Sequence, residues 1–165
     1  MSGRQISIEP LTREAFAPFG TVIDKAAVAP RPMNAGKARR FHDLAPVAVA
    51  DPDGQVVIGA VEADPYALPL RLNLVERHPL GAQAFIPLND APFLVVVCPD
   101  ENGAPGRPQA FVTGPGQGVC YAIGTWHGVL TPLDKRQDFW VIDRCGPGVN
   151  LEEHLFGEPW IIAFA

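Results

Sequence analysis

The sequence predicts an all-β protein, a closed barrel or two-sheet jelly roll with one short helix near the N-terminus. Its 165 residues include 16 glycines and 18 prolines, which interrupt helices and favour short strands joined by turns. Segments rich in apolar, β-branched and aromatic residues recur along the chain. Turn signals such as Asp53-Gly54 and Asn102-Gly103 separate them.

Helix and strand signals follow in chain order. Thr12 can cap a helix over residues 13–17, which Pro18 and Gly20 end. We predict a polar loop over residues 99–108. Strands are predicted over residues 55–63, 69–78, 84–87, 93–98, 109–112, 118–123 and 137–144.

Composition bounds the domain count, the partners and the compartment. With 47% hydrophobic and 19% charged residues, residues 1–165 are expected to form a single domain. A net charge of −5 without a dense basic run argues against nucleic acid as a partner. The longest apolar run, residues 93–98, is too short to span a membrane. Three cysteines without CxxC spacing indicate reduced thiols, so we expect a cytoplasmic protein.

The predicted strand 69–78 carries two chemically reactive side chains. Alternation places Glu76 and His78 on the same face as Leu70, Leu72 and Leu74, which we expect to be the barrel interior. The other, wetter face carries Arg71, Asn73 and Arg77. A carboxylate and an imidazole on an apolar face need partners, which a metal, a substrate or an arginine can supply.

Two short patterns resemble the paired motifs of the cupin superfamily. Glu76-x-His78 followed by Gln83 resembles the first motif, HxH with a later Glu, and Ala122-x-Gly124 followed by His127 resembles the second, PxG with a later His. Glu replaces the first His, Gln replaces the Glu, and Ala replaces the Pro. Imidazole and oxygen donors of this kind suit nickel, manganese, iron or zinc. We therefore predict a metal site formed by Glu76, His78, Gln83 and His127.

Longer segments resemble one family within that superfamily. They are residues 11–20, 34–36, 40–45, 76–88 (ERHPLGAQAFIPL), 118–127 and 138–144. Over about residues 6–156, the chain resembles the ureidoglycolate lyase family. The resemblance implies a cupin-type β-barrel, a homodimer, and a divalent metal such as nickel. It also implies cleavage of (S)-ureidoglycolate to glyoxylate and urea in the use of allantoin-derived nitrogen.

The residues are compatible with that reaction. Ureidoglycolate carries a hydroxyl, a carboxylate and a urea nitrogen on one carbon, so removing the hydroxyl proton lets the C–N bond break while an acid protonates the urea. A metal chelated by the substrate lowers the pKa of that hydroxyl. We predict catalytic roles for Glu76, His78 and His127, with Gln83 binding metal or substrate. Periodicity does not separate a ligand role from a general-base role for Glu76.

Three further substrate-binding residues are predicted in the family-like N-terminal segment. Asn34, Arg40 and His42 are expected to shape or cover the pocket. Two other functions stay open, because a fold alone does not determine chemistry. One is a cupin that binds a small acid without turnover, and the other is a metal-dependent oxygenase or sugar isomerase. The altered metal motif argues against an Fe(II) oxygenase, which presents two histidines and one carboxylate.

Overall fold

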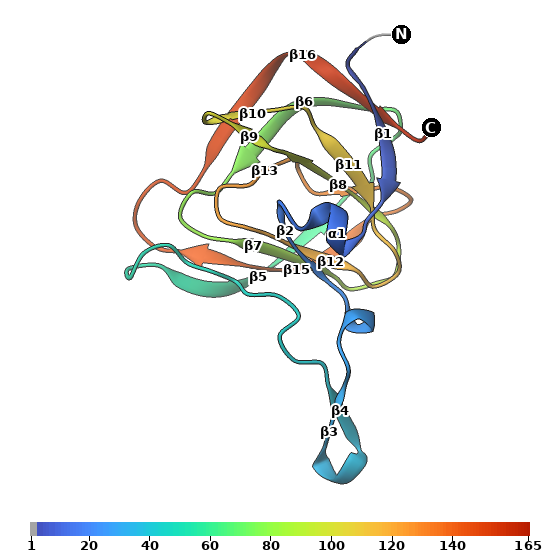
Figure 1. The fold of residues 1–165 in the computed structure, drawn as a ribbon, viewed down its shortest axis with the longest axis vertical. Coiled ribbons are helices and arrows are strands. Elements are labelled where there is room, and N and C mark those ends of the chain that lie inside the picture. Colours follow the sequence, from blue (N-terminus) through green and yellow to red (C-terminus); the bar gives the residue numbers. More distant parts are fainter. Residues whose placement is uncertain (1–2) are drawn as a thin grey trace.

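The computed structural model describes residues 3–165, which form a six-strand barrel beside a five-stranded sheet (Figure 1). The barrel strands follow the order β11, β1, β16, β6, β13, β8, and β8 pairs back with β11 to close the ring. A short strand, β14 (Thr131–Pro132), pairs antiparallel with β8. The barrel strands are β1 (Gln5–Pro10), β6 (Leu70–Arg77), β8 (Phe93–Cys98), β11 (Gln109–Val112), β13 (Trp126–His127) and β16 (Glu152–Ala163).

The five-stranded sheet has the order β2, β12, β7, β15, β5, all antiparallel. Its strands are β2 (Gly20–Ile23), β5 (Gln55–Ala63), β7 (Gln83–Pro87), β12 (Gly118–Tyr121) and β15 (Gln137–Cys145). The short helix α1 (Arg13–Phe16) begins as predicted, because the Thr12 hydroxyl accepts a hydrogen bond from the Ala15 amide. The predicted all-β barrel with one short α-helix is therefore confirmed.

Two apolar clusters fill the molecule. The barrel cluster receives side chains from all six barrel strands: Ile6, Ile8, Leu72, Val75, Leu94, Val96, Cys98, Ala110, Trp126 and Ile162. The inter-sheet cluster joins α1 and the five-stranded sheet to the barrel: Leu11, Phe16, Phe19, Val22, Phe85, Phe93, Val95, Val97, Phe111, Val119, Tyr121, Phe139 and Val141. Strand β8 serves both clusters with alternate residues, which is why its whole run is apolar and buried.

A hairpin projects from the body of the molecule on the side of the five-stranded sheet (Figure 1). Strands β3 (Arg31–Met33) and β4 (Ala38–Arg40) form a separate two-stranded sheet, joined by the 3-10 helix η2 (Asn34–Gly36). The 3-10 helix η1 (Lys25–Ala27) lies just before it in the chain. We call residues 31–42 the arm. Its sequence has no strand pattern, and the structure shows that none of its residues is buried.

Several strands lie outside the predicted segments. The predicted loop at residues 99–108 is wrong in part, because it contains a small hairpin of β9 (Asp100–Glu101) and β10 (Ala104–Pro105). The longest strand, β16, is missed because Gly157 and Pro159 interrupt its pattern. Both lie within the register shift between Leu155 and Trp160, where an irregular ladder tolerates them. In the described part of the chain, no helix is long and apolar enough to cross a membrane.

Candidate functional site

Strands β6 and β13 bring Glu76, His78 and His127 together. His127 lies directly opposite Glu76 in the ladder, and His78 follows the end of β6 by one residue. One ligand atom from each side chain lies within 4.8 Å of the others, and the Glu76 Oε1 to His78 Nε2 distance is 3.8 Å. We call these three residues the triad. They come from two motifs far apart in sequence, yet they meet at one point.

The predicted face of β6 is wrong in detail. Leu72 packs in the barrel cluster together with Val75, although the two have opposite parity along the strand. Glu76 follows Val75 directly and places its carboxylate near His127, whose ring stacks on Tyr121 of the inter-sheet cluster. The triad therefore lies between the barrel and the five-stranded sheet, not on the face that Leu72 shares. Alternation is interrupted where the neighbouring strand β16 shifts its register.

Both imidazole rings are held in the same tautomer. His78 Nδ1 lies 2.8 Å from the Asn150 carbonyl oxygen, and His127 Nδ1 lies 2.9 Å from the Gly128 carbonyl oxygen. A carbonyl only accepts, so each Nδ1 carries the hydrogen and each Nε2 keeps a lone pair. Both Nε2 atoms are buried and have no hydrogen-bond partner among the described residues. Two oriented lone pairs beside a carboxylate form a donor set that fits a divalent metal.

Burial shifts the pKa values of two triad residues, His127 and Glu76. His127 is 1% exposed, and this burial lowers its pKa to about 4, with nearby His78 acting in the same direction and the Gly128 hydrogen bond opposing. Its ring is therefore neutral at neutral pH, which is the form that binds metals. Burial also raises the pKa of Glu76, where Glu153 adds repulsion and His78 opposes. A carboxylate with a raised pKa is a stronger base.

Tyr121 is a site residue that the sequence reasoning missed. Its ring stacks on His127 with centroids 4.1 Å apart and planes 4° from parallel. Burial raises the pKa of the Tyr121 hydroxyl, and the Glu76 charge raises it further, so the hydroxyl stays protonated. Strand alternation in residues 118–121 contained the signal, since Val119 and Tyr121 share the inward face.

Gln83 lies on β7 directly opposite Tyr121. Its amide nitrogen donates to Asp143 Oδ2 at 3.3 Å, and its amide oxygen is buried without a hydrogen-bond partner in the described chain. Asp143 therefore orients the amide so that the oxygen remains available for a metal or substrate. Asp143 is a second residue missed by the sequence reasoning, which noted it only within a family-like segment.

The three predicted substrate-binding residues of the N-terminal segment do not join the triad within the chain. Asn34, Arg40 and His42 all lie on the arm, whose strands pair only with each other among the described strands. His42 Nε2 lies 3.3 Å from Asp43 Oδ1, next to it in sequence. The arm therefore separates these residues from the triad side chains they are predicted to serve.

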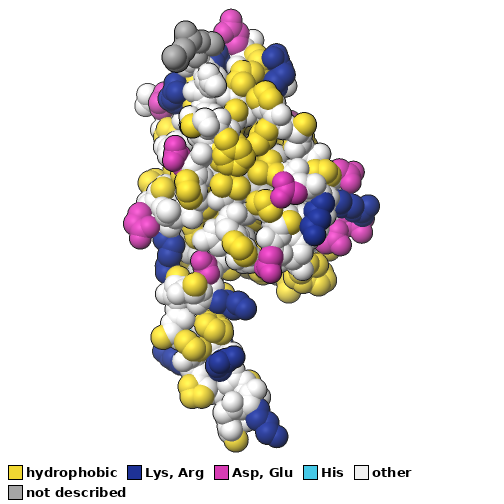
Figure 2. All heavy atoms as spheres, turned by 90° about the vertical axis from the view of Figure 1, so that its right-hand side faces the viewer, with side chains coloured by type: hydrophobic (Ala, Val, Ile, Leu, Met, Phe, Trp, Pro, Cys, Tyr) yellow, Lys and Arg dark blue, Asp and Glu magenta, His cyan; other side chains and the backbone are white. Residues whose placement is uncertain are grey.

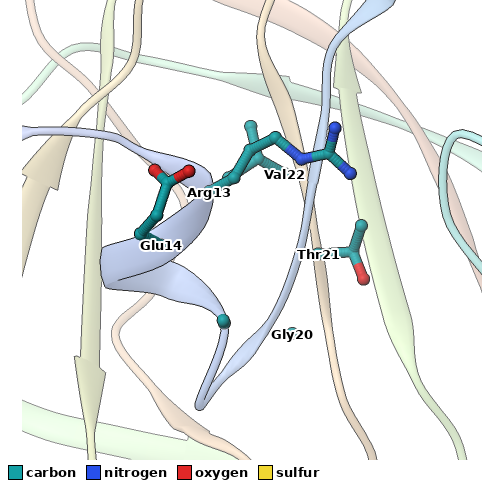
Figure 3. A pocket seen from close by; sticks show the side chains of 6 residues that line it. Arg13, Glu14, Gly20, Thr21 and Val22 are labelled. Carbon is teal, nitrogen blue, oxygen red and sulfur yellow. The ribbon is translucent and has the colours of Figure 1, made fainter. Parts of the chain in front are cut away.

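A surface hollow lies between α1 and β2, away from the triad residues (Figure 3). Arg13, Glu14 and Thr21 line it, and Arg13 donates to the Ala27 carbonyl oxygen at 3.4 Å. No triad residue lines this hollow. Its charged groups do not form a metal-binding set, so the triad remains the candidate site.

Comparisons with known proteins identify the family of the chain. The family model described as ureidoglycolate lyase matches residues 3–163. Ureidoglycolate lyase from Chelativorans sp. is 58% identical over 96% of this chain and 96% of its own length. Ureidoglycolate lyase from Mesorhizobium japonicum is 55% identical over 96% of this chain and 97% of its own length. Ureidoglycolate lyase 2 from Rhizobium meliloti is 53% identical over 97% of this chain and 98% of its own length.

Among solved structures, an oxalate decarboxylase from Lactobacillus farciminis in complex with formate has a TM-score of 0.42 and 14% identity, too distant to carry an argument. The match covers 77% of this chain and 33% of that one. The near-complete family match and the high identities over the full length of the relatives carry the assignment instead. The chain belongs to the ureidoglycolate lyase family.

Proposed function

We propose that this chain cleaves ureidoglycolate to glyoxylate and urea at the triad. The observation that carries the proposal is the convergence of two buried, unpartnered Nε2 atoms with the Glu76 carboxylate. It occurs in a chain whose relatives are named ureidoglycolate lyase. The (S) enantiomer and a role in allantoin-derived nitrogen use belong to the same proposal.

His78 and His127 would hold a divalent metal through their Nε2 atoms, with the Gln83 amide oxygen as an oxygen donor. A bound metal supplies Lewis acidity that lowers the pKa of the substrate hydroxyl. The neutral His127 ring needs no deprotonation before it binds, because burial lowers its pKa to about 4. Nickel is the metal we propose.

Glu76 is assigned the proton transfers. Its carboxylate, with a raised pKa, accepts the hydroxyl proton as the C–O bond becomes the aldehyde C=O and the C–N bond breaks. The same carboxyl group then returns that proton to the departing urea nitrogen, so the reaction consumes no net proton. The alternative, in which Glu76 is a metal ligand, predicts a different result for a Glu76→Gln variant. A Glu76→Gln variant that keeps its metal but loses turnover identifies a base, whereas loss of metal identifies a ligand.

The assay follows glyoxylate, urea and ammonia from racemic ureidoglycolate, with and without a chelator and without urease. We expect equal amounts of glyoxylate and urea, no ammonia, and consumption of one enantiomer. Chelation should stop the reaction and nickel should restore it. Stoichiometric ammonia would mean attack at the ureido carbonyl and would overturn the lyase assignment. His127→Ala serves as the inactive control.

We further propose a homodimer in the cytoplasm. Strand β5 ends the five-stranded sheet and exposes apolar side chains, of which Ile58 is 72% exposed. Such an edge is suited to pairing with a second chain. Cys98, Cys120 and Cys145 are free thiols in the structure, in keeping with a reducing compartment.

A further inference from the structure

The arm lacks packing within its own chain. None of residues 31–42 is buried, and β3 and β4 form a sheet of their own. An isolated two-stranded hairpin is at best marginally stable in water. At its tip, Asn34 and Ala35 both have positive φ, a conformation that surrounding contacts normally maintain. We therefore expect the arm to pack against another molecule.

The arm is also strongly basic. It contains four of the 13 lysines and arginines of the chain and none of its 18 acidic residues. The rest of the chain has nine basic residues against 18 acidic ones. Figure 2 shows the basic side chains along the projecting hairpin. A second copy of this chain is a partner of complementary charge.

One face of the arm gathers its charges. Arg31 and Arg40 are directly opposite each other in the β3–β4 ladder. Together with Pro32, Met33 and His42 they line a shallow hollow. Like charges directly opposite on a hairpin destabilise it unless an anion lies between or near them. This face is therefore suited to a carboxylate.

The triad site needs a cationic group, because the proposed substrate, ureidoglycolate, carries a carboxylate. The arginine beside the triad, Arg77, is already paired with Glu152 and with Asp100 at 2.9 Å. Arg144, which follows Asp143, is paired with Asp51 at 2.8 Å. Neither is free to bind the substrate. The Arg31 and Arg40 guanidinium groups of the arm have no ion-pair partner among the described residues and can supply the positive charge that a substrate carboxylate needs.

The five-stranded sheet offers a surface for the second copy. Strand β5 contains neither lysine nor proline, the residues that commonly protect an edge strand. Ile58 and the neighbouring Trp140 of β15, 47% exposed, lie beside this edge. The arm projects from the same side of the molecule as this sheet (Figure 1). A symmetric interface along β5 would therefore place the arm of each protomer near the five-stranded sheet of the other.

We propose that a second copy of the chain covers the β5 edge and that its arm completes the triad site in trans. In this arrangement Arg40 and Arg31 of one protomer bind the substrate carboxylate at the triad of the other. The inference rests on the proposed ureidoglycolate chemistry for its ligand. It also explains how Asn34, Arg40 and His42 can be substrate-binding residues although their own chain keeps them apart from the triad.

Complementation between two inactive chains tests the proposal. Arg40→Ala should raise KM and lower kcat/KM by about 10- to 100-fold, the scale of a lost charge-assisted hydrogen bond. His127→Ala has an intact arm but no working triad. Co-refolding the two variants should restore about a quarter of the wild-type rate, because half of the dimers are hybrids and each has one complete site.

Two controls make that result specific. Arg39→Ala, one residue away on the other face of the hairpin, should retain the wild-type KM. Co-refolding His127→Ala with Glu76→Gln, both with intact arms, should restore nothing. If the Arg40→Ala and His127→Ala mixture shows no more activity than the separate variants, the arm does not act in trans and the proposal is wrong.

Hydrogen exchange tests the docking without any turnover. Arm amides should exchange slowly in the wild-type protein and rapidly in Ile58→Asp, which should sediment as a monomer. Leu155→Asp, a comparably exposed position on β16, should keep both the dimer and the protection. Protected arms in a protein that does not cleave ureidoglycolate would overturn the proposed function and leave the docking intact. Rapid exchange in the wild-type protein would overturn the docking.

Discussion

His127 and Arg40 belong to one predicted site, but the chain holds them in opposite ways. The His127 ring is buried, stacked on Tyr121 and oriented by the Gly128 carbonyl. Arg40 lies on an arm without a buried residue, and Arg31 is its partner in the hairpin ladder. The first residue receives its geometry from its own fold. The second lacks such contacts in the described chain, and we propose that a partner supplies them, so the two should respond differently to mutation, pH and concentration.

The largest expected effect is the loss of either triad histidine. His78→Ala and His127→Ala should each lower kcat/KM by about 10²–10⁴-fold and lower the metal content. If both rings act through one site, as we propose, the double variant should be about as inactive as the worse single variant. Measured rates, bound metal and melting temperatures check this. Additive losses, or near-full turnover in one single variant, would show that the histidines do not act as a unit.

Acid should destabilise the metal-free protein through His127. Its pKa is about 4 in the folded chain against an ordinary value of 6.5, so the unfolded chain binds more protons between these values. The stabilising contribution is complete above pH 6.5 and is lost as pH falls toward 4, by about 3 kcal/mol. Glu76 has the opposite effect on stability just above its ordinary pKa of 4.5. Its pKa is raised in the folded chain, so there the folded chain binds more protons than the unfolded chain.

Denaturant titrations between pH 7.5 and pH 4.5, with chelator present, measure this loss. The wild-type protein should lose more unfolding free energy than His127→Gln. Arg40→Ala should follow the wild type, because it leaves the buried His127 ring unchanged. Parallel curves for wild type and His127→Gln would contradict the burial argument.

Dilution should dissociate the proposed dimer and so remove the partner's arm from the triad. As dimers dissociate, the rate per chain should fall toward that of Arg40→Ala, about 10- to 100-fold lower. The metal content per chain should stay constant, since the triad belongs to one chain. Sedimentation over the same concentrations gives the dimer fraction. A constant rate per chain in samples that are fully monomeric would show that the arm is not needed.

The smallest effect is expected at Asp143. Asp143→Asn removes the carboxylate that orients the Gln83 amide, so activity or metal affinity should fall about tenfold. The matched control is Asp138→Asn on the same strand, whose side chain is exposed beside Arg136. Equal activity in both variants would mean that Gln83 keeps its orientation without Asp143.

Local patterns in the sequence were sufficient for several strands of the core, the Thr12 cap and the three triad residues. These features depend on neighbours a few positions apart: alternation reveals β8, and the motif spacing identifies His78 and His127. Such signals are reliable where a segment's own side chains determine its structure.

Only the tertiary structure decided which residues meet. The face of Glu76 depends on a register shift in β16, a strand whose glycine and proline hide it from the pattern. Tyr121 and Asp143 became site residues through strand pairing, because ladders join positions that are distant in sequence. The arm shows the same dependence. Its residues carry the family-like motif, but their distance from the triad results from a chain path that no local pattern contains.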